Sequence, residues 1–152
     1  MILNDVLTKQ NVFTKIILKD GDKELSKELK VKVMRIRMAY SKVKKTFDAE
    51  AQEFAEELMT DEFKELSSKL DKTAKEEEKY TELSNTINSE YQEFLIQKGK
   101  EEITLGIEDS FTMDEYEDIV EVNAGNDVDI NGRKISAVDF LEIVYDLFVK
   151  ED

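Results

Sequence analysis

The longest hydrophobic pattern in the chain runs from about residue 24 to residue 58. Apolar side chains recur there at steps of three and four residues, with one stutter: Leu29, Val33, Ile36, Tyr40, Val43, Phe47, Ala51, Phe54 and Leu58. Such a stripe is typical of a helix that packs against a partner along one side. We therefore expect a long helix, followed by a joint at residues 59–61 in which Thr60 caps the next helix.

A second helical stripe follows this joint and ends near Gly99. Its members are Phe63, Leu66, Leu70, Ala74, Tyr80, Leu83, Ile87, Tyr91 and Phe94. The pattern is weakest around residues 74–78. A chain that runs out and returns in this way is most simply an antiparallel helical hairpin. Each arm would hold about 30 residues and span roughly 45 Å at the helical rise.

The two ends of the chain carry shorter patterns. Residues 3–17 have apolar positions at helical steps and predict an amphipathic helix that ends before Asp20. Residues 12–18 are also rich in strand-forming side chains, so a strand is the open alternative there. Residues 101–107 alternate enough to predict a short strand.

Capping and turn signals organise the last 40 residues. Thr112 with Glu115 predicts the start of a short helix through Val122, and Ser136 with Asp139 the start of a final helix through Phe148. Between them, Asn131-Gly132 is the dipeptide that favours a two-residue β-hairpin turn, so strands are expected at 128–130 and 133–135.

Together these patterns predict a mainly α fold with a minor α+β part. We expect a long antiparallel helical hairpin with a small C-terminal cap that contains a β-hairpin and two short helices. Residues 1–99 would form the N-terminal helix and the hairpin, and residues 100–152 the acidic α+β cap packed on it. The sequence shows no internal repeat.

Composition restricts the chemistry that the protein can perform. Of its 152 residues 38% are charged and 40% apolar, and it contains no Cys, His or Pro. The commonest general base and the thiolate and imidazole metal ligands are therefore absent. We predict no catalytic residue, no metal ligand and no cofactor site, and hence a protein that is not an enzyme. No signal peptide or membrane span is expected.

Charge is divided unevenly along the chain. Residues 1–50 carry 12 Lys and Arg against 7 Asp and Glu, whereas residues 51–152 carry 10 against 29. The basic excess lies between Lys27 and Lys45, where eight cations accompany one acid. With a joint at Thr60, Lys45 would lie opposite residue 75, so that salt bridges to the acids of residues 76–93 would explain the split. A nucleic-acid or protein surface is the alternative.

Two acidic features allow further interpretations. Asp127, Asp129 and Asn131, with Asp139 in place of a terminal Glu, resemble the opening of an EF-hand calcium loop, although the spacing departs from that motif and a β-hairpin explains the same residues. Residues 101–152 carry 16 acids against 3 cations, which would suit either a soluble cap or an imitation of DNA phosphates.

The layout of the chain is similar to a family of small tailed-phage proteins. The likeness covers residues 25–148: the run at 29–37 that leads into a long charged hairpin, the short hairpin around 129–135, and the closing helix from Ile135. It implies a non-enzymatic, protein-binding component of a phage, in the virion or its assembly pathway. The alternative is an acidic inhibitor of a nucleic-acid-binding host defence enzyme.

The resemblance also sets expectations about partners and location. We expect one or more protein partners, either other virion proteins or further copies of this chain, and neither direct nucleic-acid nor membrane binding. The protein would act in the host cytoplasm or the virion. The calcium loop remains a third interpretation.

Overall fold

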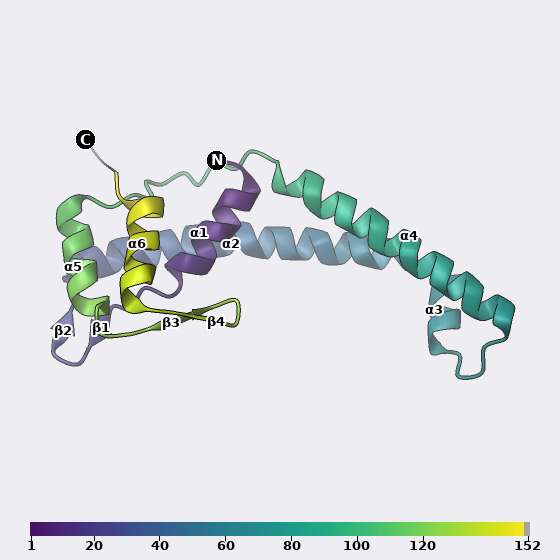
Figure 1. The fold of residues 1–152 in the computed structure, drawn as a ribbon. Coiled ribbons are helices and arrows are strands. Elements are labelled where there is room, and N and C mark those ends of the chain that lie inside the picture. The colour runs from purple at the N-terminus through teal and green to yellow at the C-terminus, as the bar shows by residue number, and fades with distance from the viewer. Residues whose placement is uncertain (151–152) are drawn as a thin grey trace.

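The computed structural model describes residues 1–150, which form six helices and two β-hairpins (Figure 1). The helices are α1 (Leu3–Phe13), α2 (Lys27–Leu58), α3 (Asp61–Ser68), α4 (Ala74–Gly99), α5 (Met113–Asn123) and α6 (Ala137–Phe148). The antiparallel hairpins pair β1 (Lys19–Asp20) with β2 (Lys23–Glu24), and β3 (Val128–Ile130) with β4 (Arg133–Ile135). The predicted mainly α fold, with its long helical hairpin and a C-terminal cap of two helices and a β-hairpin, is confirmed.

One order of elements occurs twice: α1, β1, β2 and α2 match α5, β3, β4 and α6. In both units a serine caps the second helix. Ser26 Oγ accepts a hydrogen bond from the Leu29 N–H, and Ser136 Oγ accepts one from the Asp139 N–H. Both turns begin with a residue of positive φ, 62° at Gly21 and 54° at Asn131. The two units therefore share a topology that the sequence does not reveal as a repeat.

The two units share one hydrophobic core. Phe13 of α1 is fully buried at its centre. Its ring contacts those of Tyr40, Phe111 and Phe148 at centroid distances of 5.6, 5.7 and 5.1 Å. Since these rings come from α2, the segment before α5, and α6, the C-terminal cap packs directly on the N-terminal helices.

The structure corrects two predictions near this core. Residues 14–18 form neither helix nor strand, because the side chain of Asn123 holds the backbone of Ile17, accepting from its N–H at 2.8 Å and donating to its carbonyl at 3.2 Å. The strand expected at 101–107 is also wrong. Its only pairing within residues 1–150 is an isolated bridge between Glu102 and Ile2, since α1 begins at the next residue and no strand lies alongside.

The predicted register of the helical hairpin is wrong as well. The Phe54 ring of α2 stacks on Phe94 of α4 at a centroid distance of 4.3 Å, so α4 runs beside the second half of α2. Residues 61–73 account for the shift, because α3 is a separate helix that packs on the start of α4 (Figure 1). The acids of residues 76–93 therefore lie beyond the basic stretch of α2, and the salt bridges expected between them do not form.

Candidate functional site

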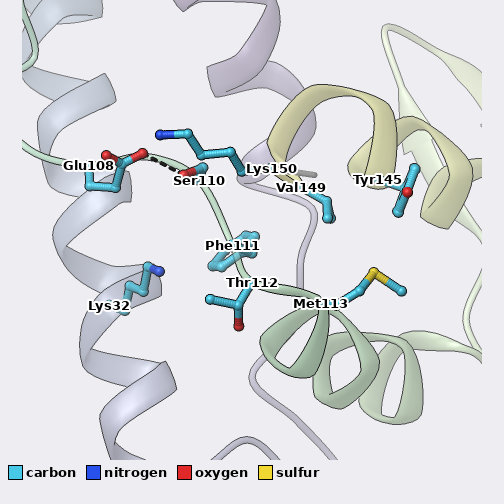
Figure 2. Close-up of a pocket in the computed structure, with 9 residues that line it drawn as sticks. All are labelled: Lys32, Glu108, Ser110, Phe111, Thr112, Met113, Tyr145, Val149 and Lys150. Atoms are coloured by element: carbon cyan, nitrogen blue, oxygen red, sulfur yellow. Dashed lines mark hydrogen bonds between the residues drawn. The ribbon is translucent and has the colours of Figure 1, made fainter. Parts of the chain in front are cut away.

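A hollow of about 460 Å³ opens where the start of α5 meets the end of α6 and the side of α2 (Figure 2). Its lining residues are Lys32, Glu108, Ser110, Phe111, Thr112, Met113, Tyr145, Val149 and Lys150. Two backbone hydrogen bonds hold Phe111 in this hollow. Its N–H donates to the Phe148 carbonyl at 2.7 Å, and its carbonyl accepts from the Lys150 N–H at 3.2 Å. Sequence reasoning missed this hollow, since no motif marks it.

Acids accompany the two lysines of this hollow. Lys32 donates to Glu115 at 2.8 Å and lies 5.4 Å from the centroid of the Phe111 ring. Burial is the largest single influence on Glu115 and acts to raise its pKa. The hydrogen bond from Lys32, the hydrogen bonds from Thr112 and the charge of Lys32 together outweigh burial, so the pKa falls below its ordinary value. A hydrogen bond from Ser110, helped by the charge of Lys150, likewise lowers the pKa of Glu108.

These contacts limit the chemistry of the hollow. The Ser110 hydroxyl donates a hydrogen bond to the Glu108 carboxylate. Because the pKa of Glu108 is lowered, this carboxylate is a poor general base for activating Ser110 as a nucleophile. The floor is apolar and the lysine charges are balanced by neighbouring acids. The arrangement therefore suits the shallow docking of an apolar side chain rather than an acid–base reaction.

A partly buried polar cluster fixes the segment that leads into the hollow. Asp109 accepts hydrogen bonds from Tyr40 Oη at 2.6 Å and from Lys9 Nζ at 3.3 Å. Burial, followed by the hydrogen bond to Asp109, raises the pKa of Tyr40 well above its ordinary value. The cluster is structural, because it ties the segment at Asp109 to both α1 and α2.

The loop that resembles a calcium site uses its oxygens within the protein. Asp129 accepts from the Gly132 N–H at 2.9 Å, and Asp127 from the Ala137 N–H at 3.1 Å. The side-chain oxygen of Asn131 accepts from Asn11 at 2.9 Å. The predicted β-hairpin is confirmed here. In the described part of the chain no cluster of three acidic side chains is arranged to hold a metal ion.

The basic stretch of α2 divides between its inner and outer sides. Two of its cations have intramolecular partners at the edge of the core: Lys32 pairs with Glu115, and the guanidinium of Arg37 donates to the Ile16 carbonyl. Four others form no ion pair within residues 1–150: Lys27, Arg35, Lys42 and Lys45. These four point outward, and exposed Met34 and Met38 lie among them.

The distal arm, defined as residues 47–94, carries an incompletely covered aromatic seam. Phe54 stacks on Phe94, and Phe63 of α3 stacks on Tyr80 with centroids 5.5 Å apart. All four rings remain partly exposed, α3 contains no buried residue, and the buried residue of α4 is Gly99, outside the arm. Leu70, at the tip, is 98% exposed. The arm therefore presents apolar surface that the chain itself does not cover.

Exposed acids also line α5 and α6. Their spacing of three and four residues places each set on one helix face. They are Asp114, Glu117, Asp118 and Glu121 on α5, and Asp139, Glu142 and Asp146 on α6. Between the helices, burial and then the charges of Glu142 and Asp146 raise the pKa of Tyr116, so the acids of α6 lie near this side chain of α5.

Comparison of the chain with protein-family models, with curated proteins and with solved structures gives no match. Across residues 1–150, the helices are too short or too polar to cross a membrane. Function must therefore be inferred from the surfaces described above.

Proposed function

We propose that this protein is a non-enzymatic, protein-binding component of a phage, which acts in the virion or its assembly pathway. The observation that carries the proposal is the aromatic seam of the distal arm. A solvated helical pair normally buries its apolar stripe, and an exposed apolar surface marks a site of interaction. The arm keeps Phe54, Phe63, Tyr80 and Phe94 only partly covered.

The shape of the molecule supports this proposal. The arm projects away from the globular part formed by α1, α5, α6 and the two hairpins (Figure 1). A projecting pair of helices can lay an apolar stripe into a groove of a partner protein. The phage context is supported by the resemblance of residues 25–148 to small tailed-phage proteins.

Site-specific photo-crosslinking in infected cells tests the proposal. A photoreactive amino acid at Leu70 should crosslink to a phage structural or assembly protein, whereas the same group at Val138 should not. Val138 is a matched control because it is 67% exposed but belongs to α6 in the globular part. Crosslinks of equal yield from both positions, or absence of the protein from both particles and assembly intermediates, would contradict the proposal.

The acid rows of α5 and α6 favour a second candidate, an inhibitor that imitates DNA. Carboxylates three and four residues apart on a helix are separated by a rise of about 4.5–6 Å, so each row presents regularly spaced negative charges. A protein that binds phosphates through Lys and Arg could accept such a surface.

A competition assay separates this candidate from the first. If the rows imitate DNA, the protein should displace duplex DNA from a host nuclease. Neutralising Asp114, Asp118 and Glu121 as amides should then weaken displacement about tenfold or more, since several charge pairs are lost. The control neutralises three arm acids: Glu77, Glu78 and Glu82. Equal loss with both variants would show a net-charge effect, and the candidate would fail.

A further inference from the structure

The side of α2 that faces away from the core carries a second regular stripe of residues. Its positions alternate in steps of four and three, and the last lies just beyond the helix end: Met38, Lys42, Lys45, Ala49, Gln52, Glu56 and Met59. All seven are exposed, Met38 to 69% and Met59 to 41%. We refer to these seven residues as the outer stripe. Such a spacing is that of a coiled-coil seam, yet no helix within residues 1–150 covers it.

The helix projection explains why the outer stripe is open. Successive residues are about 100° apart, so the outer stripe lies opposite the positions that α2 buries. Those positions are Leu29, Val33, Ile36, Tyr40 and Ala51. In Figure 1, α1 crosses α2 on the near side, and α1 and α4 both contact α2. A second helix could therefore lie along the outer stripe without meeting them.

Along this side of α2, side chains of opposite charge lie at equal distances before and after Ala49. Lys45 lies four residues before Ala49, and Glu53, beside the outer stripe, lies four residues after it. Lys42 lies seven residues before Ala49, and Glu56 seven residues after it. Two antiparallel copies of α2 centred on Ala49 would thus place each lysine opposite a glutamate of the other copy.

These charges are available for such pairing. Within residues 1–150, none of Lys42, Lys45, Glu53 and Glu56 takes part in an ion pair. Within the same residues, the one hydrogen bond made by any of these four side chains is the surface bond that Gln52 donates to Glu56 at 3.3 Å. At the ends of the overlap, each Met38 would meet Met59 and Thr60 of the other copy, so exposed methionines would become covered.

We propose that two copies of this chain form a symmetric dimer through the outer stripe, with their α2 helices antiparallel about a two-fold axis at Ala49. The small side chain of Ala49 allows the helices to approach closely at the axis. Each Lys–Glu pair occurs twice by symmetry, as in any isologous interface. The dimer uses a surface distinct from the aromatic seam of the arm, and it does not depend on the proposed function.

Cysteine substitution tests the position of the axis, because the natural chain contains no cysteine. A disulfide needs two Cα atoms about 4.4–6.8 Å apart, which two residues at position 49 satisfy only near the two-fold axis. Ala49→Cys should therefore oxidise to a covalent dimer at high yield. Asp48→Cys, exposed and about 100° around the same helix, is the matched control. Treated with the same mild oxidant, it should form little covalent dimer.

Charge reversal tests the pairing by sedimentation equilibrium. Lys42→Glu with Lys45→Glu should raise the dimer dissociation constant by about 100-fold, since four charge pairs become repulsive. Glu53→Lys with Glu56→Lys should have a similar effect. The four substitutions combined exchange the signs at both ends of the outer stripe and should restore the dimer.

Several results would overturn the dimer. The natural chain could remain monomeric up to millimolar concentration, the fourfold variant could fail to dimerise although its circular dichroism is native, or both cysteine variants could crosslink equally. A monomer that retards a single-stranded DNA probe in gel electrophoresis only when Lys42 and Lys45 are present would mean that these two lysines bind nucleic acid instead. None of these results bears on the crosslinks expected from Leu70.

Discussion

At the scale of single residues, Asn123 joins the two helix–hairpin–helix units. It is 3% exposed, and its side chain uses both donor and acceptor groups on the backbone of Ile17 while also donating to the Ile119 carbonyl at 2.8 Å. Asn123→Leu should lower the free energy of unfolding by roughly 1–3 kcal/mol, because buried backbone groups lose their partners. Urea denaturation followed by circular dichroism measures this change.

A neighbouring asparagine provides the control for Asn123. Asn126 donates to Asp20 at 2.9 Å, but at the surface, so water can replace the bond. Asn126→Ala should change the free energy of unfolding by about 0.5 kcal/mol or less. Equal effects of the two substitutions would mean that the Asn123 bonds contribute no more than surface contacts do.

At the scale of elements, the start of α4 depends on a charged capping box. Thr73 Oγ1 accepts from the Glu76 N–H, and the Glu76 carboxylate accepts from the Thr73 N–H at 3.1 Å. The hydrogen bond from Lys69, followed by that from the Thr73 backbone, lowers the pKa of Glu76 from 4.5 to about 2. The pKa of Glu76 is lower in the folded chain than in the unfolded chain. Its ionised carboxylate therefore stabilises the helix start fully at pH values above the unfolded-state pKa, and this stabilisation is lost as the pH falls toward the folded-state pKa.

The prediction for this element is therefore a pH-dependent helix start. The protection of first-turn amides of α4, meaning their exchange rate relative to the intrinsic rate at the same pH, should fall between about pH 4.5 and pH 2 in the natural chain, and Glu76→Gln should abolish this dependence. An NMR titration of the Glu76 carboxyl group checks the cause, because Lys69→Ala should raise its pKa. An unchanged Glu76 titration in Lys69→Ala would contradict the assigned role of Lys69.

The same element shows how far the sequence predicts this fold. Periodicity and caps identified the long helix, the helices after Thr112 and Ser136, and the Asn131-Gly132 hairpin, because each has a local signal. The Thr73–Glu76 capping box is also a local signal, but the apolar stripe that continues from Phe63 masks it and shifts the predicted register of the hairpin. The bond between Asn123 and Ile17 has no local signal, since it joins residues 106 positions apart. The hollow beside Phe111 likewise arises only from packing.

At the scale of the whole molecule, the globular part should fold without most of the distal arm. The core unites α1, the first half of α2, α5 and α6, whereas between residues 51 and 94 Ala51 alone is buried. Lys98 pairs with Glu50, so α2 and α4 lie side by side where the globular part ends. Packed helix axes are about 8–10 Å apart, a distance that a flexible linker of about four residues can span.

Replacing residues 51–94 with such a linker should thus leave the aromatic core intact. Near-ultraviolet circular dichroism from Tyr40 and its phenylalanine neighbours should persist, and unfolding should remain cooperative, because no residue of the removed segment belongs to this core. Loss of the tertiary signal would show instead that the arm is needed for folding. The shortened chain lacks Glu53 and Glu56, so it should also be monomeric at concentrations where the natural chain dimerises. A folded but still dimeric variant would place the interface outside the outer stripe, since three of its seven residues would then be missing.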